Sequence, residues 1–588
     1  MSGSDEVFEW VEIDLPTCTR VYGTVPCTAA LSAQNPHKCF NLRATCQDPA
    51  NFLLGAPITL KFSKIGAPLP AGFQAFPALR GVRQSSTTAN IGGADPRYGT
   101  LGKQATLDFE LEDFTYHDRG VDIYASERVS GAAQFSTVGY KPEQRSTFLA
   151  KLRARWPNYA GGAVRLCRAY IVGGIITDQS TYNHILKEMA GPTDGVLRVS
   201  AYSIFDLMNG KTALCPKPNR GVLTADMTAV ATTFNVTPSG IGNAEYAASG
   251  FLTIGSEVMA FTRTADALTV TRGQKGTVAA THTAGDTVQQ AWTCTNARLD
   301  DVAEELITDF TTTPASWITF ADWQAEVTRW GTSIRLTTTV TSPTPVGTLV
   351  GELADLGCNI IPDERAGKIR LRMNRPIDGD TVYTVTDANA YEITQEDREE
   401  DRVTQVYFVH KRADPTKGIG SGDDVSNYLR RALTINPDAV EVYGDVRTRT
   451  VKTRWLDQGD DTTVAIISWQ LLRRFQLAPM RVKCLIDARD KAILLSDVVQ
   501  LQTDDMASTV GEVTTRLMQV IGRAEPIPYH TVQVELQRFE FSGRFGYITP
   551  DIYPVYGSAT DAEKEAGAFI VDETSLLFPD GLGPYRII

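Results

Sequence analysis

Apolar and polar residues alternate in the first third of the chain, and this pattern predicts strands. In the segment 105–114, ATLDFELEDF, the residues Leu107, Phe109 and Leu111 share one face. A period of two is typical of a strand that is buried on one side. The stretch VRLCRAYIV follows the same rule, so we expect residues 54–220 to form mainly strands.

One segment in this region has the period of a helix instead. Residues 146–156, STFLAKLRARW, begin with Ser146, a residue type that favours the N-cap position. The apolar stripe of the segment consists of Phe148, Leu149, Leu152 and Trp156. We therefore predict one amphipathic helix, packed on the strands by this stripe.

The composition changes at Gly221. From there to about residue 288 the chain is rich in Thr, Ala, Gly and Val, and short apolar runs alternate with Gly and Asp turns, as in 250–277. This pattern predicts a small, separate β module.

The last part of the chain contains segments with the period of a helix and segments with the period of a strand. Residues 346–356 carry an apolar helical stripe that ends at Gly357. Residues 359–363 and 368–373 predict a hairpin, and residues 463–477 predict a second helix. We therefore expect a mainly β, multidomain fold with α+β parts.

Chain length predicts the number of domains, and net charge argues against one class of function. At roughly 150 residues per domain, 588 residues predict three to five domains. The 57 Lys and Arg residues against 69 Asp and Glu residues give a net charge of −12, which disfavours a protein whose main task is binding nucleic-acid phosphate. No apolar run is long enough to span a bilayer and no secretory signal is visible, so we expect a reducing cytosol as the place of folding.

The nine cysteines fall into two groups. Five are scattered singly and are expected in the core: Cys167, Cys215, Cys294, Cys358 and Cys484. The other four, Cys18, Cys27, Cys39 and Cys46, crowd into 29 consecutive positions with eight, eleven and six residues between them. Zinc sites usually have closer cysteine pairs, whereas these long spacings suit an iron–sulfur cluster better. Disulfides and free thiols remain alternatives.

The sequence contains no recognisable catalytic motif. No GxSxG, HExxH or Walker A pattern occurs, so we do not expect an enzyme. Acidic groups such as Glu400 and Asp460 keep one alternative open, a hydrolase that degrades cell-wall or surface polymer. A third alternative is a ferredoxin-like or zinc redox module within a larger enzyme.

Four segments, in order along the chain, resemble hub or tail-tip proteins of long-tailed bacteriophages, including siphophages. They are the cysteine-bearing stretch 26–52, the helix and strand at 146–172, the β-module stretch 268–288, and the C-terminal stretch 546–570. The resemblance implies a structural protein of the virion, located at the tail tip after assembly in the host cytoplasm.

The resemblance also implies an architecture. Hubs of this family are homotrimers, in which two related β-barrel domains per chain form a ring of six units. The implied divisions are a cysteine-rich segment 1–53, a first hub barrel 54–220, an inserted β domain 221–293, a second hub domain 294–410 completed by 480–545, a connecting loop and helical region 411–479, and an extended C-terminal tail 546–588.

The family further implies partners and a cofactor. A hub closes the tail tube and contacts the distal tail protein, the tape measure protein and the fibre or tip proteins that attach to the host. DNA passes through its lumen at ejection without specific binding. By resemblance, Cys18, Cys27, Cys39 and Cys46 are expected to hold an iron–sulfur cluster of the [4Fe-4S] type, with zinc as the alternative.

Overall fold

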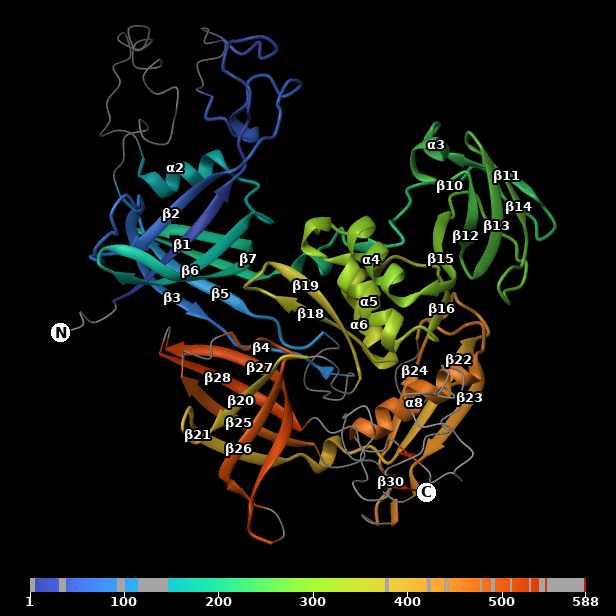
Figure 1. The fold of residues 1–588 in the computed structure, drawn as a ribbon. Helices are drawn as coiled ribbons and strands as arrows, with labels where there is room; N and C mark the ends of the chain where they lie inside the picture. The colour runs from blue at the N-terminus through green and yellow to red at the C-terminus, as the bar shows by residue number, and fades with distance from the viewer. Residues whose placement is uncertain are drawn as a thin grey trace.

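The computed structural model is mainly β and multidomain, as the sequence predicts (Figure 1). The residues that it describes are 6–30, 39–91, 101–114, 146–375, 380–419, 425–437, 440–441, 444–475, 479–487, 492–507, 510–527, 530–538, 545–546 and 586–587. The expected C-terminal tail therefore lies almost wholly outside the described residues. Within them, no helix is long and apolar enough to cross a membrane.

The first body is a closed seven-stranded barrel in the order β1-β2-β3-β5-β8-β7-β6. Its strands are β1 (Glu6–Leu15), β2 (Ile58–Lys64), β3 (Phe76–Gln84), β5 (Thr106–Glu112), β6 (Ala163–Val172), β7 (Ile175–Thr193) and β8 (Val196–Ser203). The predicted face of β5 is confirmed, because Leu107, Phe109 and Leu111 are all buried in the barrel core.

The predicted helix is confirmed as α2 (Phe148–Arg155), which adds its apolar residues to the barrel core. The predicted N-cap is wrong, because the N-cap residue is Thr147 and its side chain accepts no capping bond. Asp113 serves instead, accepting hydrogen bonds from the backbone N–H of Phe114 and Leu149 and from the Thr147 hydroxyl. The capping carboxylate thus belongs to Asp113, which directly follows β5 and lies 36 residues before Leu149 in the sequence.

A second, barrel-like sheet lies directly below the first barrel in Figure 1. Its order is β20-β26-β27-β28-β25-β21, from β20 (Val382–Thr386), β21 (Ala390–Asp397), β25 (Met480–Asp487), β26 (Val498–Ala507), β27 (Val513–Ile527) and β28 (Thr531–Arg538). Each of the two sheets contains one parallel pair, β2–β3 in the first and β20–β26 in the second. The short strand β4 (Thr87–Thr88), which follows β3, pairs with β27 and so joins the two sheets.

The inserted β module forms its own core, as the composition predicts. It contains β10 (Val222–Leu223), β11 (Thr233–Thr237), β12 (Ser249–Ile254), β13 (Glu257–Thr264), β14 (Ala267–Thr271) and a short helix, α3 (Ile241–Glu245). The next strand, β15 (Gln289–Arg298), pairs with β12 through its first residues and with β16 (Arg335–Val340) through the others. One strand therefore belongs both to the module and to the body that follows.

That following body is helical and lies at the centre of the molecule (Figure 1). It packs α4 (Leu299–Phe310), α5 (Phe320–Trp330) and α6 (Val346–Glu352) around one large apolar core. After α6 a short 3-10 helix ends at Gly357, which has the left-handed φ of 84° that glycine favours. The predicted hairpin then follows as β18 (Cys358–Asp363) and β19 (Lys368–Met373).

A further small sheet and one helix pack on the core of the helical body. The sheet has the order β23-β22-β24, from β22 (Gln405–Arg412), β23 (Tyr428–Ile435) and β24 (Thr448–Lys452). The predicted second helix is confirmed as α8 (Asp461–Phe475), and its buried residues Val464, Ile467 and Leu471 join the core of the helical body.

Candidate functional site

The four clustered cysteines line one cavity. It lies in the segment between β1 and β2, which projects from the end of the first barrel near α2 (Figure 1). The cavity contains about 350 Å³ of space not filled by atoms, part of it open to solvent. Cys18, Cys27, Cys39 and Cys46 all border it. The structure therefore brings together the residues that the sequence singles out.

Turns and backbone hydrogen bonds place three of the four thiols. Cys18 follows the end of β1, and its backbone N–H donates to the carbonyl of Asn41 at 2.8 Å. Cys27 closes a turn, donating to the carbonyl of Thr24 at 2.8 Å. Cys46 directly follows the 3-10 helix η1 (Arg43–Thr45). The turn-forming residues of this segment thus allow ligands from separate loops to meet.

One carboxylate ties these loops together. Asp48 accepts hydrogen bonds from the backbone N–H of Thr28 at 2.8 Å and from its hydroxyl at 2.9 Å, which joins the Cys27 loop to the Cys46 loop. Asn51 donates to the same carboxylate. These hydrogen bonds lower the pKa of Asp48, with that from the backbone of Thr28 the largest cause. Sequence reasoning missed Asp48, although an Asp two residues after a cysteine in a turn-rich segment is a usable signal.

The second half of the segment between β1 and β2 packs against the barrel. Leu42 is buried in the barrel core. The Arg155 guanidinium, at the end of α2, lies 3.5 Å from the centre of the Phe40 ring, which is a cation–π contact. The cavity is therefore held against the barrel on the side of Cys39 and Cys46.

Two of the sulfurs receive backbone hydrogen bonds. The N–H of Arg20 donates to Cys18 Sγ and the N–H of Asn41 donates to Cys39 Sγ, each at 3.4 Å. Burial, followed by the nearby Cys18 and Cys27, raises the pKa of Cys46, because neighbouring thiolates repel a further negative charge.

Four thiols are the ligand set of common iron–sulfur clusters and of one class of zinc site. Among the described residues, no three His, Cys, Asp or Glu side chains stand close enough together to hold one metal ion. None of the nine cysteines forms a disulfide.

The scattered cysteines lie mostly in the core, as expected. Cys167, Cys215, Cys358 and Cys484 are buried, and Cys294 is partly buried. Burial raises the pKa of each; for Cys167 and Cys484 it reaches about 12. At neutral pH these thiols are protonated side chains of the interior.

The acidic residues of the hydrolase alternative have structural partners. Asp460 accepts hydrogen bonds from the backbone N–H of Thr462 and Thr463 at the start of α8, so it caps that helix. Glu400 is an exposed side chain paired with Arg398. Neither lines the cysteine cavity.

Comparisons with known proteins give structural likenesses only. No protein-family model matches the chain, and its sequence matches no curated protein. The 43 kDa tail protein of prophage MuSo2 from Shewanella oneidensis has a TM-score of 0.34 at 8% identity, over 78% of this chain and 94% of that one. The prophage tail protein gp18 from Listeria monocytogenes has a TM-score of 0.30 at 12% identity, over 65% and 86%.

A third solved structure is the lidded PdpA-VgrG complex of Francisella. Its TM-score is 0.32 at 10% identity, over 94% of this chain and 55% of that chain, so this chain spans about half of that protein's length. Each of the three TM-scores is below 0.5.

Proposed function

We propose that this chain is the central hub of a phage tail tip. In this role it is a homotrimer that closes the tail tube and connects it to the tip or fibre proteins used in host attachment and DNA ejection. The observation that carries the proposal is the pair of barrel-like sheets lying side by side in one chain and joined by β4 and β27. Three such chains supply the six similar units that a six-fold tail tube requires.

The resemblance of four sequence segments to tail-tip proteins supports the same role. In this arrangement the inserted β module and the small β22–β24 sheet project outward from the ring. The tail tube, the distal tail protein and the tape measure protein are its partners inside the virion. A net charge of −12 per chain favours free passage of DNA, because like charge reduces sticking to the lumen.

Labelling of virus particles tests this proposal. An antibody raised against the purified chain is expected to bind at one end of the tail in electron micrographs, at the end away from the capsid. Binding along the whole tail, or only to non-particle protein, contradicts the role of a hub.

We further propose that the four cysteines hold an iron–sulfur cluster. Cys18, Cys27, Cys39 and Cys46 are its ligands in this proposal, and Asp48 positions two of their loops. When bound, the cluster supplies covalent links across a segment that contains few buried apolar residues. Because the ligands must be deprotonated, binding couples folding of this segment to metal loading.

Metal content and colour test this second part. The protein purified without oxygen is expected to be brown and to contain iron and sulfide, and Cys46→Ser is expected to lose both. Cys294→Ser is the matched control, since Cys294 is also only partly buried and lies outside the cavity. A colourless protein with bound zinc indicates a zinc site, and four freely titrating thiols without metal contradict any metal centre.

A further inference from the structure

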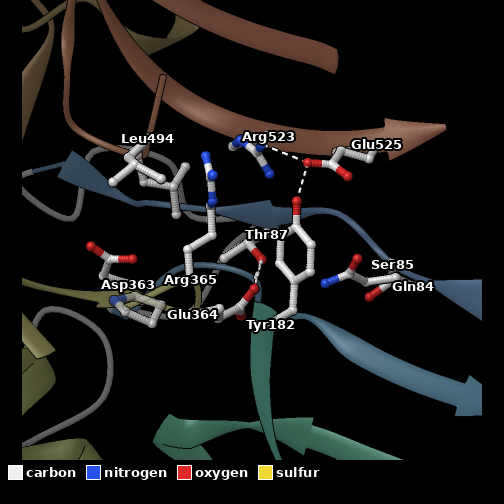
Figure 2. A pocket seen from close by; sticks show the side chains of 13 residues that line it. Gln84, Ser85, Thr87, Tyr182, Asp363, Glu364, Arg365, Leu494, Arg523 and Glu525 are labelled. Carbon is white, nitrogen blue, oxygen red and sulfur yellow. Dashed lines mark hydrogen bonds and ion pairs between the residues drawn. The ribbon is translucent and has the colours of Figure 1, made fainter. Parts of the chain in front are cut away.

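The tip of the β18–β19 hairpin enters the junction between the two barrel-like sheets. Figure 2 shows this place, where side chains from the first barrel, the second sheet and the hairpin meet around a cavity of about 480 Å³, part of it open solvent. Five of these residues, together with Arg168, which pairs with one of them, form what we call the junction cluster: Thr87, Arg168, Tyr182, Glu364, Arg523 and Glu525. They come from β4, β6, β7, the hairpin tip and β27.

The two sheets contact each other through charged side chains in this cluster. Arg168 of β6 pairs with Glu525 of β27 at 3.0 Å, and the Tyr182 hydroxyl of β7 donates to the same carboxylate. Arg523 also pairs with Glu525, at 2.7 Å. Arg168 holds Glu9 on its other side at 2.8 Å. Arg168 and Arg523 therefore pair with Glu9 and Glu525 in a buried place, and the half-exposed Lys64 also contacts Glu9.

The hairpin tip is bound to the first barrel on one side. The backbone N–H and the side-chain Nδ2 of Asn183 both donate to the carbonyl of Glu364, each at 2.8 Å. The Arg365 guanidinium donates to the Ser180 hydroxyl at 3.3 Å. At Gly367, whose φ is +62°, a Cβ atom would lie only 3.1 Å from Asn183, so the tip is packed tightly on β7.

The same tip contacts the strand that joins the two sheets. The Thr87 hydroxyl of β4 donates to the Glu364 carboxylate at 3.3 Å, and Thr87 is paired with Arg523 in the β4–β27 ladder. Nearer its base, the hairpin contributes Ile360 to the core of the helical body and Ile361 to the core of the second sheet. One hairpin thus touches all three bodies.

We propose that the hairpin tip, residues 363–367, is a lock that fixes the second sheet against the first barrel. The contacts of the tip are hydrogen bonds, which are lost together when it withdraws, because Glu364 and Asn183 each take part in more than one. Withdrawal also widens the solvent access of the cavity beside the junction cluster, part of which is already open. The paired Arg and Glu groups can then exchange their mutual contacts for hydration, which loosens β4 from β27.

The experiment is hydrogen exchange of the full chain followed by mass spectrometry. Glu364→Arg places a cation beside Arg523 and removes the acceptor of Thr87, and we expect at least tenfold faster exchange in peptides covering β4 and β27. Peptides from the inserted module are expected to exchange as before. The control is Glu112→Arg, which makes the same charge change at the exposed end of β5 and is expected to leave β4 and β27 unaltered.

A milder variant covers the case in which Glu364→Arg does not fold. Asn183→Ala removes the Nδ2 bond to the tip but leaves the backbone bond, and an increase of about threefold in the same peptides is expected. Unchanged exchange of β4 and β27 in whichever of the two variants folds overturns the proposal. Faster exchange throughout the chain, the inserted module included, also overturns it, because that result reflects general loss of stability.

Discussion

At the scale of single residues, Glu364 gives the chain a pH response near neutrality. Burial raises its pKa to about 7, against the opposing effects of Thr87 and Arg523. A carboxyl with a raised pKa binds more protons in the folded state than in the unfolded state. Its contribution to stability is therefore complete below about pH 4.5 and is lost as the pH rises toward 7.

We predict that Glu364→Gln removes this response. The amide keeps the shape of the protonated acid and does not ionise. The difference in urea midpoint between Glu364→Gln and wild type is expected to grow in favour of the variant between pH 5 and pH 8. A constant difference across that range contradicts a raised pKa at Glu364.

Asp460 allows a second residue-scale prediction. Because it accepts two backbone N–H groups at the start of α8, Asp460→Ala is expected to cost about 1 kcal/mol of stability. Asp460→Asn, which can still accept these bonds, is expected to cost much less. Chemical denaturation measures both. Since hydrogen bonds to Thr463 are the largest cause of its lowered pKa, the stabilisation is present above the ordinary carboxyl range and is lost as the pH falls through that lowered pKa.

The sequence allowed the cysteines to be predicted as a group but not the junction cluster. Four cysteines within 29 positions form a local signal, and one turn-rich segment is enough to bring them to one cavity. Thr87 and Glu364 are 277 positions apart, and Tyr182 and Glu525 are 343 apart. These residues come together only when the first barrel, the second sheet and the hairpin pack on one another. No local sequence pattern predicts that packing.

At the scale of elements, the inserted module depends on one buried carboxylate. Glu257 at the start of β13 is fully buried and pairs with Arg272 at 2.6 Å and with His282 at 2.9 Å. The backbone N–H groups of Gly273 and Ala280 also donate to it, each at 3.0 Å. Despite the opposing effect of burial, these partners lower the pKa of Glu257 to about 2.

We predict that Glu257→Ala destabilises the module by about 3–5 kcal/mol, because it leaves a buried Arg272 without its counter-charge. Hydrogen exchange in peptides from β13 and β14 is the measurement. Glu245→Ala is the control, since it also removes an Arg partner of the module but at the exposed Arg220. Similar effects from the two variants contradict the role of Glu257.

Elements with a strong local period were predicted well. The strand with Leu107 and Phe109, the β18–β19 hairpin and the helix α8 all lie within a few residues of their expected bounds. The N-cap of α2 was predicted wrongly because Thr147, not Ser146, directly precedes the helix, and the capping bond from the N–H of Leu149 goes to Asp113, just after β5. Caps that come from distant positions need tertiary structure to be identified.

At the scale of the whole molecule, the proposed hub predicts a defined assembly. Native mass spectrometry or light scattering of the purified chain is expected to give three times 64.3 kDa. Averaged electron micrographs are expected to show three-fold symmetry with six lobes around a lumen. A stable monomer at micromolar concentration, unchanged by addition of tail-tube protein, contradicts this assembly.

The strand β15 has a mechanical consequence. It is hydrogen-bonded to β12 at one end and to β16 at the other, and α4 begins at the residue after it. A force on the inserted module is therefore carried along the backbone of one strand, which has a bulge between Cys294 and Ala297, into the helical body. A molecule that binds the inserted module would therefore transmit force to the helical body, to which the β18–β19 hairpin belongs.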